Sequence, residues 1–584
     1  MKKSGKWKVQ FLVMAFCVLG LVAVLVGSSY AIFSDVSDQG DYNTVTTGTL
    51  QLSYEDTQSL SLSNLYPVSD VEGMTGEGYT FTVRNIGTLP SDYKVMIQDD
   101  EAMIQADGCS DHLMPKANIK ISVDGGMPFL LSSIEESNYM ITTGNLQPGD
   151  SVTHVVKVWI DEASGNEILG THFHGKVVVE GIQGEFVYRD ESGANPPELV
   201  DGMIPVTYNG TNWVKADTSS EWYNYSNQEW ANAVTVTEGT RSKYMSATAG
   251  TEILMNDINT MWVWIPRYEY QYTNLGTQYA GGTKEQPGEI KVNFLNGTTN
   301  QASDASNYKV HPAFTFGDKE LTGLWYAKFE TTGTLATPCT DTNCDTSQVT
   351  IKPGVTSLRN QSISSFFYMA RSIQLNNSNT FGFSSSNGDV HMSKNSEWGA
   401  VAYLSQSKYG KYGNPNYEEA NKEVAINNCK NYITGIGGDT VSASSSSTTC
   451  TTNTYETSKG QSASTTGNIT GVYDMSGGTS EYVMGNYNNT IKNSGFSAMP
   501  ESKYYDLYTK FSASTACNSR ICYGQALSET SGWYADYASF VGSGIPWVHR
   551  GGNYSNSTLA GVFLFNSSDG HAYSTYSSRF TVAP

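Results

Sequence analysis

Six cysteines in the later part of the chain form three pairs that are close in sequence: Cys339 with Cys344, Cys429 with Cys450, and Cys517 with Cys522. In an oxidising compartment, thiols at such spacings close small disulfide loops. The C-x4-C spacing of the first and third pairs also allows a metal site, but no histidine stands beside either pair. Disulfides are the favoured interpretation, and free thiols stay open.

A second group of residues with recognition chemistry lies between residues 553 and 577. This stretch mixes Tyr, Ser, Asn and Gly, as antibody paratopes do, where Tyr gives rigid contact area and Ser and Asn give adaptable hydrogen bonds. The apolar run 562–565 between the polar runs predicts a buried strand that holds them. The whole chain is rich in these residue types, so composition alone is the alternative explanation. We expect an exposed ligand-binding face made of Tyr554, Asn566, His571, Tyr573 and Tyr576.

The histidines do not suggest an enzyme. His311, His391, His549 and His571 are scattered, and none belongs to an H-E-x-x-H or G-x-S-x-G pattern. A triad assembled from distant residues stays open, because such triads have no fixed sequence order. We expect a non-catalytic protein.

Charge and the first residues of the chain predict export. The formal net charge is −21, with 35 basic and 56 acidic residues, which argues against nucleic acid as a partner. Several lysines precede an apolar run from Phe11 to Val26, and small residues follow up to Ala31. This order predicts a signal peptide at residues 1–31. The run is shorter than the ~20 residues of a membrane helix. An uncleaved anchor is the alternative, and it would be the chain's one contact with a membrane.

Residues 32–188 predict an all-β module. Apolar and polar residues alternate over 50–54, 79–83 and 93–97, and further strand-like runs cover 152–160 and 176–180. Short strands at such spacing favour a sandwich of the jelly-roll or immunoglobulin-like kind.

Three short stretches of this module resemble the TasA/camelysin family: Ala31-Ile32-Phe33-Ser34-Asp35, Thr47-Gly48-Thr49-Leu50 and Val83-Arg84-Asn85-Ile86-Gly87. The resemblance implies an exported β-sandwich of biofilm matrices and cell surfaces. It also implies self-association, because members of that family polymerise by adding an N-terminal strand to a neighbour's open sheet edge.

Residues 189–202 are polar and carry a double proline, which predicts a linker. From residue 203 to 584 tryptophans cluster and long Ser/Thr/Asn loops intervene. Helical spacing of apolar residues predicts a helix near residues 396–404.

Three segments of residues 203–584, in order, resemble the formylglycine-generating-enzyme family, a variant of the C-type lectin fold. They are residues 391–400, residues 471–483, and residues 550–554 together with 578–580. The first segment resembles the start of a helix, with Ser393 as its N-cap. The resemblance implies an α+β, C-type-lectin-like C-terminal domain.

The same resemblance implies calcium at the second segment. Carried over by position, Asp474 and Glu481 supply carboxylates, and Gly477 and Thr479 supply backbone carbonyls. Hard oxygen ligands of this kind suit calcium, and a loop closed by its own hydrogen bonds is the alternative. The family's enzymes bind copper through two cysteines after the R-G-G motif. Residues 553–584 contain no cysteine, so we expect no copper and no formylglycine chemistry.

Together these features predict a multidomain chain with an N-terminal all-β sandwich and a C-terminal α+β domain. The favoured function is adhesin-like binding, in which a secreted or cell-surface protein holds an extracellular protein or a glycan. The alternatives are a matrix protein that polymerises through its sandwich, and an enzyme of unknown chemistry.

Overall fold

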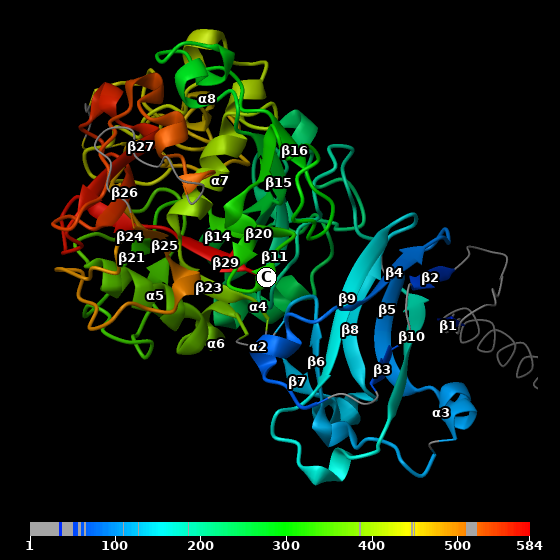
Figure 1. Ribbon diagram of the computed structural model, residues 1–584. Helices are drawn as coiled ribbons and strands as arrows, with labels where there is room; N and C mark the ends of the chain where they lie inside the picture. The colour runs from blue at the N-terminus through cyan, green and yellow to red at the C-terminus, as the bar shows by residue number, and fades with distance from the viewer. Residues whose placement is uncertain are drawn as a thin grey trace, which may run out of the picture. The chain divides into compact units, whose positions relative to one another are not determined.

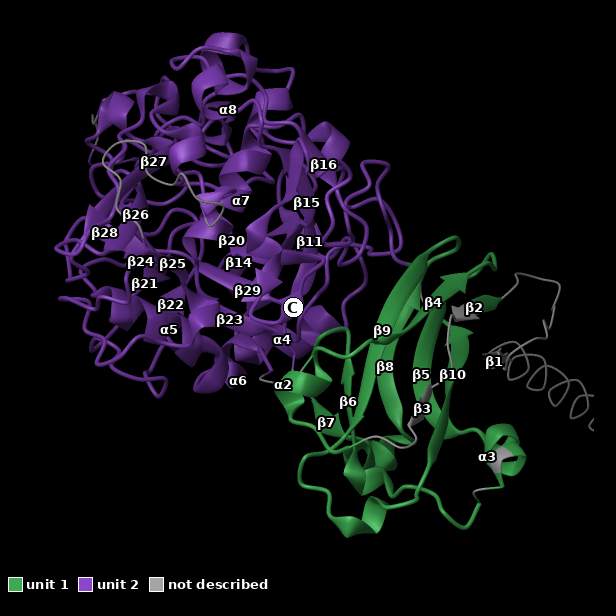
Figure 2. Ribbon diagram, in the orientation of Figure 1, with its two compact units in different colours: residues 1–186 green, residues 187–584 purple. Residues whose placement is uncertain are grey.

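The computed structural model describes residues 34–37, 51–56, 60–62, 66–108, 110–126, 128–184, 186–384, 387–444, 448, 450–509 and 522–584. The expected signal peptide, residues 1–31, lies outside the described residues. The chain divides into two compact units, Met1–Phe186 and Val187–Pro584 (Figures 1 and 2). Both units are built mainly from antiparallel sheets, so the chain is a β-rich multidomain protein.

The first unit contains two five-stranded sheets. One has the order β1-β10-β5-β8, with β3 also paired to β10, and the other has the order β2-β4-β9-β6-β7. Two short helices, α2 (Asp70–Gly73) and α3 (Glu101–Asp107), lie between strands. The strands are β1 (Ser34–Ser37), β2 (Leu52–Asp56), β3 (Leu60–Leu62), β4 (Tyr79–Asn85), β5 (Ser91–Asp99), β6 (Ile119–Val123), β7 (Phe129–Leu130), β8 (Met140–Leu146), β9 (Ser151–Ile160) and β10 (Phe173–Gln183).

Alternation of side chains lets these two sheets contribute to one core. Along β4 the buried positions alternate with half-buried or exposed ones, as the sequence predicts for strands with one face in the core. One hydrophobic core contains Phe81 and Ile121 from the second sheet together with Val95 and Val179 from the first. The sheets also share a polar contact, because Tyr93 Oη lies 2.9 Å from His154 Nε2.

The second unit contains seven-, five- and three-stranded sheets and two strand pairs. The seven-stranded sheet has the order β12-β11-β13-β14-β20-β29-β23, and the five-stranded sheet has the order β25-β24-β26-β27 with β28 paired to β24. The strands of these two sheets are β11 (Ile204–Tyr208), β12 (Trp213–Lys215), β13 (Asn232–Val236), β14 (Ile258–Pro266), β20 (Gly323–Ala327), β23 (Asp389–Met392), β24 (Ser480–Tyr487), β25 (Asp506–Tyr508), β26 (Trp547–Gly551), β27 (Gly561–Ser568), β28 (Tyr576–Ser578) and β29 (Phe580–Ala583).

The smaller sheets and the helices complete this unit. The three-stranded sheet is β16-β15-β17, and the pairs are β18-β19 and β21-β22. Their strands are β15 (Tyr268–Gln271), β16 (Val292–Phe294), β17 (Tyr308–Val310), β18 (Thr315–Phe316), β19 (Lys319–Glu320), β21 (Thr332–Gly333) and β22 (Val349–Thr350). The α-helices are α4 (Glu238–Met245), α5 (Ile363–Leu375), α6 (Ser378–Phe381), α7 (Asn395–Ser405) and α8 (Ser458–Gln461).

Strand β29 lies between β20 and β23, although β20 precedes it in the chain by more than two hundred residues (Figure 1). All four of its residues are buried, and so are all nine residues of β14 in the same sheet. Burial on both faces explains why these strands are rich in Trp, Val, Ile and Phe and do not alternate with polar residues. Residue 579, directly before β29, is thereby carried into the core.

Helix α7 covers the expected segment, but it begins one residue later than its expected cap implies. Lys394, and not Ser393, is the N-cap. The Ser393 hydroxyl is occupied elsewhere, donating to Tyr326 Oη at 3.1 Å. Instead the Glu397 carboxylate reaches back and accepts from Lys394 N at 2.8 Å, which satisfies an N-terminal backbone donor.

The expected linker at residues 189–202 is part of the second unit. Asn195 is buried, and its amide Nδ2 donates to the carbonyls of Leu295, Gly297 and Thr322 at 2.8–3.0 Å. Val200 is also buried. This polar stretch is fixed to the second unit, because the Asn195 amide binds backbone carbonyls there.

Candidate functional site

The five-stranded sheet positions the residues predicted to bind a ligand. The apolar run 562–565 lies within β27 and is buried, as the sequence predicts. Across the sheet Tyr482 on β24 is paired with His549 on β26, and His549 is paired with Asn566 on β27. Directly opposed residues of antiparallel strands point to the same face, so these three side chains share one face of the sheet.

Five rings form a continuous strip at this face. The centroid of the His571 ring is 3.9 Å from that of Tyr573, and Tyr573 is 4.6 Å from Tyr576. The Tyr576 ring lies 4.6 Å from His549 and 5.0 Å from Tyr482, and its hydroxyl is 3.0 Å from His549 Nε2. The strip therefore runs from exposed His571 down to buried Tyr482.

Asp569 fixes the exposed end of the strip. Its Oδ1 lies 2.8 Å from His571 Nδ1, and its Oδ2 accepts from Asn493 Nδ2 at 2.8 Å. Partial burial acts to raise the pKa of Asp569, but the hydrogen bonds from Asn493 and His571 outweigh it and the pKa is lowered. The carboxylate stays charged and holds the His571 ring in one orientation.

Tyr554 belongs to a second ring group. It meets the Tyr432 ring edge-on at 5.0 Å, and the Arg359 guanidinium lies 3.9 Å over the Tyr432 ring. Arg359 Nη1 donates to the carbonyl of Ser574 at 2.6 Å, which joins this group to the turn that carries Tyr573 and Tyr576. We call the combined surface the aromatic face, made of Arg359, Tyr432, Tyr554, Asn566, His571, Tyr573 and Tyr576.

The expectation that all five predicted residues are exposed was wrong. His571 is exposed, with 46% of its side chain accessible, whereas Tyr554, Asn566, Tyr573 and Tyr576 are half-buried. The tyrosines lose exposure because their rings pack on one another. Burial also raises the pKa of the Tyr576 hydroxyl to about 12.

Sequence reasoning missed Arg359, Tyr432, Asn493 and Asp569. The first three come from segments far from the C-terminal tyrosines, and only the fold brings them beside residues 569–576. Asp569 lies inside the predicted stretch, and its position two residues before His571 is the one local signal that could have singled it out.

Behind the face lies a buried group of charges. Glu481 forms a two-point ion pair with Arg579, with Nη2 to Oε1 at 2.7 Å and Nε to Oε2 at 3.0 Å. Asp474 accepts from Asn427 Nδ2 at 2.8 Å and from Gly435 N at 2.9 Å. The sequence motif thus brings Asp474 and Glu481 into one region, with protein groups as their partners.

Glu330, which the sequence did not single out, is the third carboxylate there. It accepts from Thr479 N at 2.8 Å and from the hydroxyl of Ser357. We call Glu330, Asp474, Glu481 and Arg579 the acid cluster, and all four side chains are fully buried.

The acid cluster has more carboxylates than cations. Burial is the main cause that raises the pKa of Glu330 and Glu481, and it raises the pKa of Asp474 to about 6. Arg579 offsets part of this effect on Asp474 and Glu481. A proton or a further cation would balance the remaining negative charge.

The predicted calcium loop is well formed but is closed by protein groups. Gly477 has a φ of 77°, where glycine is favoured, and Thr479 uses its backbone N–H to bind Glu330. In the part of the chain that the structure describes, no group of three or more His, Cys, Asp or Glu is arranged to hold a metal. Calcium at Asp474, Gly477, Thr479 and Glu481 stays a prediction.

The acid cluster supports the aromatic face through the loop at residues 477–480, which is part of the predicted calcium loop. Tyr554 N donates to Gly478 O at 3.0 Å, and Ser480 N donates to Thr575 O at 3.0 Å. Both loop residues neighbour Thr479, which binds Glu330. The two ring groups are therefore anchored to the same buried charges.

Two expected disulfides are present. Cys339 is bonded to Cys344 and Cys429 to Cys450, with Cα–Cα distances of 5.3 and 5.7 Å. Cys522 is buried and disulfide-bonded, and the prediction for Cys517 lies outside the described residues.

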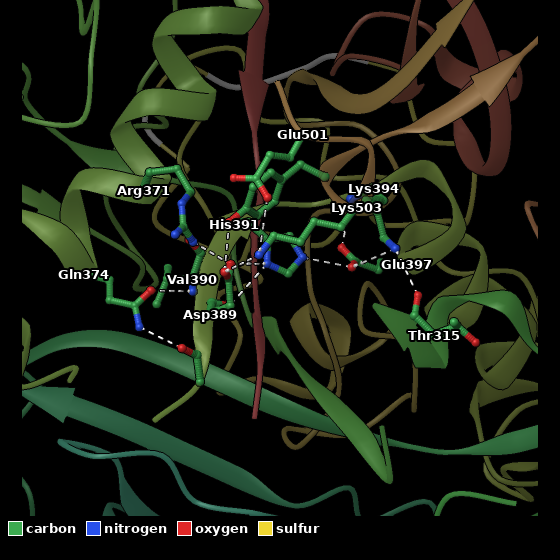
Figure 3. A network of polar contacts seen from close by, with 12 residues as sticks. Thr315, Arg371, Gln374, Asp389, Val390, His391, Lys394, Glu397, Glu501 and Lys503 are labelled. Atoms are coloured by element: carbon green, nitrogen blue, oxygen red, sulfur yellow. Dashed lines mark hydrogen bonds and ion pairs between the residues drawn. The ribbon is translucent and has the colours of Figure 1, made fainter. Parts of the chain in front are cut away.

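A second charged group joins β23 to α7 (Figure 3). His391 is fully buried, with Nε2 2.9 Å from Glu397 Oε1 and Nδ1 3.2 Å from Asp389 Oδ1. Arg371 Nη1 lies 2.5 Å from the same Asp389 oxygen. Burial acts to lower the pKa of His391, but Glu397 and Asp389 outweigh it and the pKa is raised. We call these four residues the histidine cluster.

Comparisons with known proteins give no identity. No family model matches the chain, and no curated protein matches it.

Proposed function

We propose that this chain is a secreted or cell-surface binding protein whose C-terminal unit presents the aromatic face to an extracellular ligand. The observation that carries this proposal is the assembly of the face. Residues from four separate parts of the chain, near 359, 432, 554 and 573, meet at one surface that is anchored to buried charges.

The chemistry of the face supports recognition. Tyr and Arg are the residue types that most often dominate binding interfaces, and tyrosine loses little conformational entropy when it is fixed. Here the rings are already held by their neighbours before any ligand arrives. Such preorganisation lowers the entropic cost of binding.

The finer fold belongs to the same proposal. We propose that the second unit is a non-catalytic relative of the formylglycine-generating-enzyme domain with a C-type-lectin-like fold, and that the first unit is a TasA/camelysin-like sandwich. The sequence segments in their family order support this assignment, as does a helix at residues 395–405 where the first segment places one. The chain lacks cysteines after the R-G-G motif, so we propose no oxygen-activating reaction for it.

A role for the first unit in self-association is the second candidate. Among the described residues, β8 is the last strand of its sheet, and one of its backbone edges has no neighbouring strand there. An open edge of this kind accepts an added strand from another chain. Among the described residues, no helix is long and apolar enough to cross a membrane.

The test uses purified protein and panels of immobilised glycans and extracellular matrix proteins. We expect a ligand that wild type binds and that Tyr573→Ala and Tyr554→Ala lose. The matched control is Tyr66→Ala, because Tyr66 lies in the first unit and is 86% exposed. Binding that survives both changes at the face would overturn the assignment of this surface.

A further inference from the structure

Arg359 is a cation without an acidic partner in an acidic protein. No carboxylate of the described residues lies within ion-pair distance of it, in contrast to Arg371 and Arg579, which both form ion pairs. The chain as a whole carries a formal charge of −21. Among the described residues, this positive group on a candidate binding face has no carboxylate beside it to neutralise.

The guanidinium is held in place but its donors are not all used. Nη1 donates to Ser574 O at 2.6 Å, and Nε reaches Ser357 O at 3.4 Å, which is long for a hydrogen bond. An arginine has five N–H donors in a planar fork. The guanidinium lies over the Tyr432 ring and also donates a hydrogen bond to the Tyr432 side chain, which together hold the fork in place. The donors that remain can meet the two oxygens of a carboxylate at once.

We propose that the ligand of the aromatic face is a glycan that carries a carboxylate, and that Arg359 receives the carboxylate while the His571–Tyr573–Tyr576 rings contact the apolar faces of the sugar units. This proposal rests on the proposed binding function. It assigns Arg359 as the residue that selects acidic over neutral sugars.

The surroundings of the rings favour a glycan over a protein partner. The residues beside the strip are small or polar, namely Asn360, Asn493, Ala572, Ser574 and Thr575, and the carboxylate beside it, Asp569, is already bound by His571 and Asn493. The centre of a protein interface is instead richer in apolar side chains. Hydroxyl and amide groups around stacked rings match the alternation of C–H faces and hydroxyls on a sugar.

The charges of the protein and the ligand predict how the association rate depends on ionic strength. The net negative charge of the protein repels an acidic glycan at long range, while Arg359 attracts its carboxylate at short range. Salt screens the long-range repulsion more than the contact. The association rate of an acidic ligand should therefore rise from low to moderate ionic strength, and that of a neutral ligand should not.

The experiment compares pairs of sugars that differ by the acid group: sialyllactose against lactose, and oligogalacturonate against the corresponding galactose oligomer. Binding is measured by calorimetry and its rates by surface plasmon resonance, with the full chain. For at least one pair we expect the acidic sugar to bind about tenfold more tightly, as a charge-assisted contact predicts. Arg359→Gln should reduce its affinity to that of the neutral partner.

Two further variants distinguish loss of the Arg359–carboxylate contact from loss of folding. Arg359→Lys keeps the charge but loses the planar fork, so we expect it to melt as wild type and to lose most of the preference for the acid. Arg84→Gln is the control, because Arg84 is exposed on the first unit.

The possible failures are distinguishable. If acidic and neutral sugars bind equally and Tyr573→Ala abolishes both, the face binds glycans and the role of Arg359 is wrong. If only an acidic peptide such as polyglutamate binds, in an Arg359-dependent way, the glycan class is wrong. If none of these sugars binds, the proposal of an acidic glycan ligand is wrong. The proposed binding function is then tested separately by the panel of extracellular matrix proteins.

Discussion

The histidine cluster and the acid cluster both bury several charges in the second unit, but they balance them differently. In the histidine cluster, His391 lies between Asp389 and Glu397, Arg371 adds a second cation, and Lys503 and Lys394 lie 3.9 and 4.0 Å from the two carboxylates, so each carboxylate has cations beside it. The acid cluster holds three carboxylates but one guanidinium, and Arg579 forms its ion pair with Glu481. A group whose carboxylates all have cations beside them holds its neighbours by ion pairs. The stability of a group with surplus negative charge depends instead on whether it binds a proton or a cation from solvent.

The two clusters also differ in which parts of the second unit they connect. The histidine cluster joins β23 to α7 (Figure 3), while the acid cluster binds the loop on which the aromatic face is mounted. Changes to the first cluster should therefore alter stability alone. Changes to the second should alter stability and ligand binding together.

The largest expected effect is at Arg579. Replacing it by Met leaves Glu481 without its partner in a fully buried site, and we expect unfolding of the second unit to become easier by about 3–5 kcal/mol. Denaturant unfolding followed by tryptophan fluorescence measures this loss. Arg84→Met is the control and should change stability by less than about 0.5 kcal/mol. A loss no larger than that of the control would show that the pair contributes little.

The next effect is at His391. The folded-state pKa of His391 is raised above its ordinary value, so its contribution is complete below the unfolded pKa and is lost as pH rises through the folded pKa. We expect His391→Gln to cost about 2–3 kcal/mol at pH 6, because buried Glu397 and half-buried Asp389 lose a charged partner. The cost should shrink as pH rises through the folded-state pKa of His391. A cost that does not change with pH would mean that His391 is neutral in the folded protein.

A smaller effect concerns protons in the acid cluster. The pKa of Asp474 is raised to about 6, above its unfolded value, so the stability that comes from its neutral form is lost as pH rises through 6. Acidification from pH 7 to 5 should therefore stabilise wild type relative to Asp474→Asn by about 1 kcal/mol. Unfolding curves of the two proteins at both pH values measure the difference, and equal responses would contradict the assigned pKa.

Calcium is the other way to balance the acid cluster, and it predicts a different response. If the ion is bound, a chelator at pH 7 should lower the melting temperature of wild type, because an ion bound to the folded state stabilises it by mass action. Asp474→Ala and Glu481→Ala should then remove that sensitivity. A wild-type melting curve that a chelator leaves unchanged would instead favour balance by protons.

The smallest effect on stability is expected at the exposed end of the ring strip. Tyr573→Ala removes a half-buried ring from the surface and should cost less than about 1 kcal/mol. Tyr576→Ala should cost more, because Tyr576 binds His549 and packs on Tyr482. Thermal melts of the two variants test this order, and the reverse order would show that the strip is not organised from His571 inwards.

Local patterns in the sequence predicted local structure well. Alternation of apolar and polar residues located strands β4 and β5, a strand-like run located β9, and helical spacing located α7. Of the residues expected on one binding face, His571, Tyr573 and Tyr576 contact one another through their rings, whereas Tyr554 packs on Tyr432.

Partners from distant segments could not be predicted. Arg359, Tyr432 and Glu330 reach the site only through the fold, and nothing in their neighbouring residues marks them. Asn195 shows the same limit in the expected linker, because its carbonyl partners lie about a hundred residues further along the chain.

The position of β29 has a consequence for how the protein is made. The seven-stranded sheet cannot close until residues 580–583 have been synthesised, because β29 separates β20 from β23. Pairings over such long separations form slowly, while the first unit can fold as soon as its own strands are available. The second unit should therefore stay open during translation and acquire its core late, after the first unit has folded.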